Sequence, residues 1–145
     1  MIYYFRSALT RFEFIVDSPP VSQQARKRGK GNSIEDWKKT VRQEAEKYWS
    51  SEQKTATGWV MLQITYFYNS DKMDVDNIVK PIQDAIKGLA YVDDKQVSDL
   101  LVRKRNLSGN FRIENMTSIL TEGFERGKQF LHIVVIDAAD QEVLT

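Results

Sequence analysis

The pattern of apolar residues in the middle of the chain is the strongest constraint on the fold. Residues 59–68 alternate β-branched, aliphatic and aromatic side chains, which predicts a long strand with both faces largely covered. Residues 77–90 repeat apolar side chains every three or four positions, which predicts a helix with one buried face. Pro81 lies near its first turn, and Gly88 is placed to end it. A second strand is predicted at residues 97–102.

Four further segments complete the predicted fold. They are a strand at 12–16, a helix at 34–50 that follows Ser33 as its cap, a helix at 116–127 capped by Thr117, and a strand at 130–137. The order is β-α-β-α-β-(α)-β, which predicts an α+β fold with a mixed β-sheet flanked by helices. A chain of 145 residues suits one such unit, so residues 1–145 are expected to form a single domain.

The composition excludes several kinds of site. The chain has no cysteine, which excludes disulfides and thiolate metal sites and is typical of a cytoplasmic protein. His132 is the one histidine, so chemistry that needs a histidine pair is excluded. Its apolar neighbours predict a packed structural residue. The sequence contains neither a signal peptide nor an uninterrupted apolar run long enough to cross a bilayer, so no membrane partner is expected.

Acidic residues punctuate the predicted strand, helix and strand. Asp74 and Asp76 precede the helix, and Asp93 and Asp94 follow it. On an extended strand end, residues two apart point to the same face, so the first pair is expected side by side. Adjacent carboxylates repel unless a cation or proton lies between them, and Mg²⁺ prefers carboxylate, water and phosphate oxygens. Because Asp93 and Asp94 are neighbours, only one can join the cluster, and spacing leaves that choice open.

Lys80 lies one helical turn beyond Asp76, so its side chain can reach the same place. A lysine there can neutralise a phosphate or the charge that develops on phosphorus. Three carboxylates and a lysine therefore predict a divalent metal site that handles phosphates and activates water for attack on a phosphodiester.

Each acidic residue also has an ordinary structural explanation. Asp76 is a good helix N-cap. The pairs Asp76–Lys80 and Lys80–Asp84 could be surface ion pairs that contribute about 0.2–0.5 kcal/mol each. Asp93 and Asp94 could form an acidic turn. These explanations account for the residues singly, whereas a metal site accounts for their occurrence in one short unit.

Two basic runs are predicted to contact nucleic acid. The first lies in the polar loop of residues 21–32, and the second follows the strand at 97–102. Clustered lysine and arginine bind the phosphate backbone without reading sequence, although a solvated basic loop is the structural alternative for the first run. The residues are Arg26, Lys27, Arg28, Lys30, Lys104 and Arg105.

The acidic segment resembles the core of the RusA family of Holliday junction resolvases. The resemblance is dense over residues 59–105 and weaker over 12–28, where Pro19-Pro20-Val21-Ser22 is similar to the proline-rich start of the family. The matching residues are Asp74-x-Asp76-Asn77-x-x-Lys80, Asp84-Ala85-Ile86, Gly88 and Asp93-Asp94-x-Gln96-Val97.

The resemblance implies a small homodimeric α+β endodeoxyribonuclease, of a kind often carried by bacteriophages or prophages. Such enzymes use Mg²⁺ or Mn²⁺ to nick four-way DNA junctions symmetrically in recombination and repair. The metal-binding aspartates of the family fall on Asp74, Asp76 and Asp94, with Asp93 the less favoured of its pair. The essential lysine falls on Lys80.

Two departures from the family pattern bear on the substrate. Gln23-Gln24 and a basic run stand where asparagine-type residues are expected, and residues 107–129 form a longer segment than in compact members. A nuclease for other branched or single-stranded DNA is therefore an alternative. Others are a non-catalytic DNA-binding protein with a structural metal site and a phosphohydrolase for small substrates. Paired cuts in a two-fold junction call for a C₂ dimer, with the final strand or residues 2–5 as expected interfaces.

Overall fold

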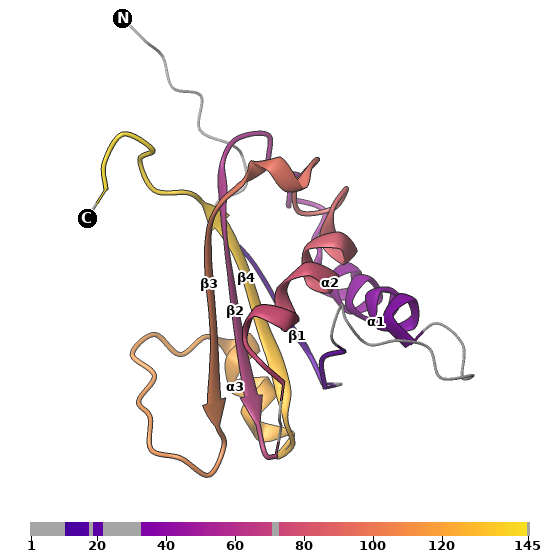
Figure 1. Ribbon diagram of the computed structural model, residues 1–145, viewed down its shortest axis with the longest axis vertical. Coiled ribbons are helices and arrows are strands. Elements are labelled where there is room, and N and C mark those ends of the chain that lie inside the picture. Colours follow the sequence, from indigo (N-terminus) through magenta and orange to yellow (C-terminus); the bar gives the residue numbers. More distant parts are fainter. Residues whose placement is uncertain (1–10, 18, 22–32, 71–72, 145) are drawn as a thin grey trace, which may run out of the picture.

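The computed structural model describes residues 11–17, 19–21, 33–70 and 73–144. Within these ranges, four strands form one mixed sheet, and three helices pack on it (Figure 1). None of the described helices is long and apolar enough to cross a membrane. The predicted α+β class and element order are confirmed. The elements are β1 (Arg11–Val16), α1 (Ser33–Tyr48), β2 (Val60–Tyr68), α2 (Asp76–Ile86), the 3₁₀ turn η1 (Asp94–Gln96), β3 (Val97–Asn106), α3 (Ser118–Glu125) and β4 (Phe130–Asp137).

The strands lie in the order β1-β4-β2-β3. β4 is antiparallel to both of its neighbours, and β2 is parallel to β3, with α2 in the crossover that a parallel pair requires. The final strand of the chain is therefore central and cannot pair edge to edge with a second copy. An interface at the final strand would therefore have to use a face of the sheet, and the other expected interface, residues 2–5, lies outside the described residues.

The ends of α2 and β3 each differ from the prediction by about four residues. α2 ends at Ile86 because the backbone of Lys87 is extended and Gly88 has a φ of 81°, which glycine adopts without strain. β3 continues to Asn106 because its basic run pairs with the end of β2. The pairing of β2 with β3 is irregular between Val60 and Met61, where β3 contributes one extra residue.

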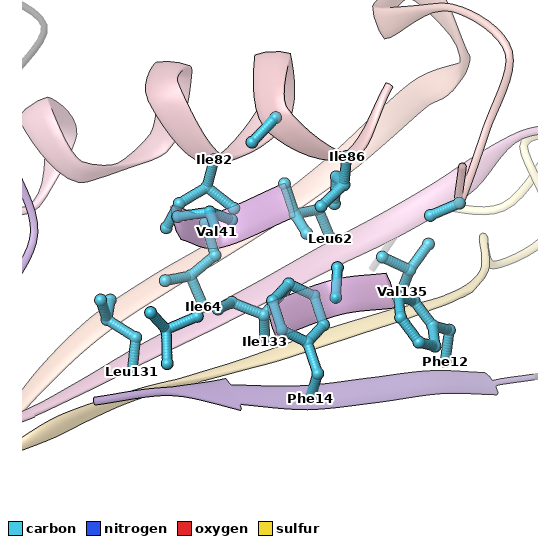
Figure 2. Packing of buried hydrophobic residues seen from close by; sticks show 14 of the residues in the cluster. Phe12, Phe14, Val41, Leu62, Ile64, Ile82, Ile86, Leu131, Ile133 and Val135 are labelled. Atoms are coloured by element: carbon cyan, nitrogen blue, oxygen red, sulfur yellow. The ribbon is translucent and has the colours of Figure 1, made fainter. Parts of the chain in front are cut away.

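The larger core lies between the sheet and the helices α1 and α2 (Figures 1 and 2). Alternate residues of each strand point toward these helices, as the two-residue period of a strand requires. Figure 2 shows Val41, Ile82 and Ile86 of the helices against this face. The strand residues labelled there are Phe12, Phe14, Leu62, Ile64, Leu131, Ile133 and Val135, all essentially inaccessible to solvent.

A smaller core on the opposite face lies beneath α3. Thr117 caps this helix as predicted, by accepting a hydrogen bond from the Leu120 amide. Gly123 lets the helix approach β4, since a Cβ atom there would lie 2.4 Å from the ring of Phe130. Phe67 of β2 stacks on the Phe130 ring, with centroids 5.0 Å apart. α3 covers one end of the sheet face that lies opposite α1 and α2 (Figure 1).

The uncovered part of the same face is polar. His132 of β4 is 8% exposed, and its Nε2 lies 2.5 Å from Oε2 of Glu13 on β1. The same carboxylate oxygen accepts a 2.6 Å hydrogen bond from the hydroxyl of Thr117. Burial lowers the pKa of His132, although Glu13 opposes this effect. The neutral imidazole can then donate to the carboxylate. The prediction of a packed structural histidine is confirmed.

Candidate active site

Asp74 and Asp76 lie at the start of α2, and both are exposed. Val75 occupies the N-cap position with helical angles (φ −54°, ψ −43°), and no side chain in the described part of the chain caps the helix. Asp76 is thus the first helical residue and does not serve as the cap, the structural role that the sequence offered for it. The extended strand end expected here is also absent, because β2 ends at Tyr68 and the Asp74 carbonyl accepts from the Asn77 amide in a turn.

Lys80 lies one turn further along α2 and bridges two carboxylates. Its Nζ is 2.9 Å from Oδ1 of Asp84 and 3.1 Å from Oδ2 of Asp94. The second oxygen of Asp84 lies 3.2 Å from Nζ of Lys38 on α1. Alternating charges therefore run from α1 across α2 to η1, and spacing in the sequence does not indicate that Lys38 belongs to this chain of ion pairs.

These contacts stabilise the charged form of the lysine. Hydrogen bonds to Asp84 and then to Asp94 raise the pKa of Lys80. Partial burial alone would raise the pKa of Asp84, but hydrogen bonds from Lys80 and Lys38 outweigh it and lower that pKa. Lys80 is therefore an ammonium group at neutral pH, which suits it to stabilise negative charge and not to accept a proton.

The adjacent aspartates have different partners. Asp93 caps η1, since its carboxylate accepts from the Lys95 amide at 3.0 Å and its own amide donates to Gln96. Asp94 instead faces Lys80, and its Oδ1 is buried without a hydrogen-bond partner among the described residues. A buried carboxylate oxygen without a partner is unfavourable unless a cation or donor binds it.

Two further side chains fix the connection between α2 and β3. The Gln96 amide donates to the carbonyls of Ala56 and Gly58, each at 2.9 Å. Tyr91 is fully buried and donates its hydroxyl to the Gln83 carbonyl at 2.8 Å. Burial raises the pKa of Tyr91, so the phenol keeps its proton as a donor. Spacing in the sequence did not indicate either anchor.

The adjacent basic residues Lys104 and Arg105 point to opposite faces of β3. Nζ of Lys104 donates to the Met73 carbonyl at 2.6 Å and lies 4.8 Å from the centre of the Tyr68 ring. Lys104 therefore holds the main chain directly before Asp74, whereas Arg105 lines a cavity on the far face. The other residues predicted to contact DNA, Arg26, Lys27, Arg28 and Lys30, lie outside the described residues.

The acidic side chains supply suitable donors for a metal without forming a closed site. In the described part of the chain, no three acidic, histidine or cysteine side chains are grouped closely enough to hold a metal ion. Carboxylate oxygens are nevertheless the donors that Mg²⁺ and Mn²⁺ prefer, and Oδ1 of Asp94 lacks any other described partner. The donor chemistry fits a hard divalent ion.

A family model described as endodeoxyribonuclease RusA matches residues 17–114 of the 145-residue chain. The chain belongs to the RusA family. Its match extends from the end of β1 through the acidic segment and β3, and stops before α3 and β4. RusA nucleases are Holliday junction endonucleases that act on branched DNA, so the resemblance seen in the sequence is confirmed. A comparison with curated proteins found no match.

Proposed function

We propose that this protein is a cytoplasmic, Mg²⁺-dependent endonuclease that resolves four-way DNA junctions by symmetric nicks during recombination and repair. The observation that carries the proposal is the contact between Lys80 and Asp94, which joins a protonated lysine to a carboxylate with one buried oxygen that has no partner among the described residues. Both residues belong to the motif that resembles the family core.

The proposed metal ligands are Asp74, Asp76 and Asp94. A divalent ion bound there supplies the charge that activates water and stabilises the leaving oxygen of a phosphodiester, and Mn²⁺ is expected to replace Mg²⁺. Lys80 directs its fixed positive charge toward the phosphate oxygens. If Asp94 binds the metal ion in place of Lys80, the ammonium group of Lys80 keeps its contact with Asp84 on α2.

Positive charge around the acidic residues is expected to hold the DNA. Lys80 and Lys104 lie on this side of the sheet, and the basic run of residues 26–30 directly precedes α1. Such residues bind phosphates without reading bases. Because a four-way junction has two-fold symmetry, we propose a homodimer that presents two such sites.

A nuclease for other branched DNA is the second candidate. It is favoured by the segment 107–129, most of which lies beyond the family match. Phe111 and Phe124 of this segment pack on Phe67 of β2, with centroids 5.6 and 4.8 Å away. The segment thus adds a surface to the sheet that lies mostly beyond the family match, and a different substrate preference is proposed to arise there.

Cleavage of a labelled synthetic four-way junction tests the proposal, with linear duplex, fork and flap substrates beside it. We expect paired nicks in the junction with Mg²⁺, and none with EDTA or in the Asp76→Asn variant. Preferred cutting of the fork or flap would favour the second candidate. Tight junction binding without cleavage, unchanged in Asp76→Asn, would overturn both in favour of a non-catalytic DNA-binding protein.

A further inference from the structure

A cavity of about 640 Å³ lies on the face of the sheet opposite the acidic residues. It is formed where the polar side chains of the four strands meet the segment 111–115. Its volume is in the range of small-molecule sites, about 300–1,000 Å³. Four arginines line it, which are Arg11, Arg103, Arg105 and Arg112.

The acidic residues near the cavity compensate only part of the positive charge of these four arginines. Within the described ranges, the one ion pair of Glu114 is an exposed contact with Arg112, at 3.5 Å. Glu13 lies 3.7 Å from Arg11, but its carboxylate is already bound by His132 and Thr117. Arg103 and Arg105 have no carboxylate partner among the described residues. Converging guanidinium groups without carboxylate partners favour a bound anion.

One of these guanidinium groups is positioned in advance. Nε of Arg103 donates to the hydroxyl of Thr65 at 2.8 Å, and Thr65 is buried. The two terminal amino groups of Arg103 have no hydrogen-bond partner within the described ranges. Nη1 of Arg105 is similarly held by the Lys104 carbonyl at 2.8 Å. The fork of Arg103 is thus free to bind two phosphate oxygens, and Arg105 keeps its other donors for the same role.

An aromatic side chain also lines this cavity. Phe111 lines it and is only partly buried, with its ring supported by Phe67. A partly exposed ring beside a cationic pocket can stack on a nucleobase, which is the pairing of groups that nucleotide recognition uses. Amide groups of Gln63 and Asn115 add hydrogen-bonding partners in the lining.

We propose that this cavity binds a nucleotide, with Arg103 and Arg105 on its phosphate and Phe111 beside its base. The phosphate can belong to a free nucleotide or to a nucleotide within a single DNA strand. A second copy of the chain is a poorer occupant, because a two-fold contact at this face would oppose arginines to arginines. Because the cavity and the acidic residues lie on opposite faces, binding does not depend on cleavage.

Calorimetric titration in EDTA tests the proposal with deoxyadenosine monophosphate, deoxyadenosine and a short single-stranded oligonucleotide as probes. We expect the monophosphate to bind and deoxyadenosine to bind far more weakly. Arg103→Gln and the solvent-exposed Arg105→Gln should each weaken binding by about tenfold or more. Lys39→Gln, which removes the same charge from the exposed side of α1, should leave it unchanged.

The oligonucleotide identifies the source of the phosphate. Binding of the oligonucleotide alone assigns the cavity to a DNA strand, and binding of both assigns it to nucleotides in general. The proposal is overturned if neither binds, or if both arginine variants bind as wild type does. It is also overturned if the arginine variants change the mass of the protein measured by sedimentation without changing its affinity for the probes. The cavity would then belong to a subunit interface. Junction cleavage is measured separately with Mg²⁺. Its outcome is expected to be independent of whether the cavity binds a nucleotide.

Discussion

Nζ of Lys80 lies 3.1 Å from Oδ2 of Asp94, although the two residues are 14 positions apart and belong to α2 and η1. The contact joins the helix that begins at Asp76 to the turn that leads into β3. The ammonium group of Lys80 and the carboxylate of Asp94 are thereby held together at the protein surface. The predictions for cleavage follow from this pair.

Asp94→Asn is expected to abolish Mg²⁺-dependent cleavage, because it keeps the shape of the side chain but removes the charge that a metal ligand needs. Asp93→Asn is the matched control, since asparagine caps a turn as well as aspartate does. It should cleave as wild type does. Rates of junction cleavage over a range of Mg²⁺ concentrations check both variants. Equal loss in the two would contradict the assignment of Asp94.

Lys80→Met should lower the cleavage rate about 10²–10³-fold, because the positive charge near the reacting phosphate is lost. Its effect on the free energy of unfolding should be below about 1 kcal/mol, because exposed ion pairs contribute little. Single-turnover kinetics and thermal unfolding measure the two effects. Lys38→Met breaks the other ion pair of Asp84 and should retain cleavage. An unfolded Lys80→Met protein would show that the lysine is structural.

The free energy of unfolding should fall as the pH is lowered through the range below 6.5. Burial holds the pKa of His132 below its ordinary value of 6.5, so the unfolded chain takes up a proton at a higher pH than the folded chain does. Burial would raise the pKa of Glu13, but hydrogen bonds from Thr117 and His132 lower it. Glu13 therefore adds a further loss of stability below its ordinary value of 4.5.

The single histidine makes this pH dependence testable. Urea unfolding of wild type and His132→Gln between about pH 5 and 7 isolates the histidine, since other side chains rarely titrate there. The slope of stability against pH should flatten in the variant. A parallel slope in the two proteins would contradict a neutral buried imidazole.

Gly123→Ala should destabilise the protein by about 1–3 kcal/mol, because the new methyl group would overlap the Phe130 ring. Alanine gains about 1 kcal/mol in helix propensity, which offsets part of this cost. The cost of Gly123→Ala should be smaller in a Phe130→Leu background, and a double-mutant cycle of unfolding free energies measures the difference. Strict additivity would exclude the clash.

The periodicity of apolar residues is sufficient to predict the four strands, the three α-helices, their order and the fold class, but not the 3₁₀ turn η1. The end of β3 was missed because three consecutive basic residues resemble a loop, whereas pairing with β2 keeps them in the strand. The sequence predicts Asp74 and Asp76 on an extended strand end, but β2 ends at Tyr68 and the chain turns into α2 at these two residues.

Contacts between distant segments could not be predicted from spacing. Lys38 reaches Asp84 only because α1 and α2 pack together on the sheet, and Glu13 meets His132 only because β1 pairs with β4. The proximity of Asp94, and not Asp93, to Lys80 depends on the cap of η1. Spacing alone left that choice open, and the family resemblance had favoured Asp94.

The extra residue of β3 opposite Val60 and Met61 has a consequence for both faces of the sheet. Side chains alternate along a strand, so one additional residue reverses the parity of every position after it. Asp94 and Gln96, before the irregularity, are fixed to the helical side, while Lys104 and Arg105 follow it. The irregularity thus changes which face the later residues of β3 point to, without changing the orientation of η1. Without it, Lys104 would face the arginine-lined cavity and Arg105 the acidic residues.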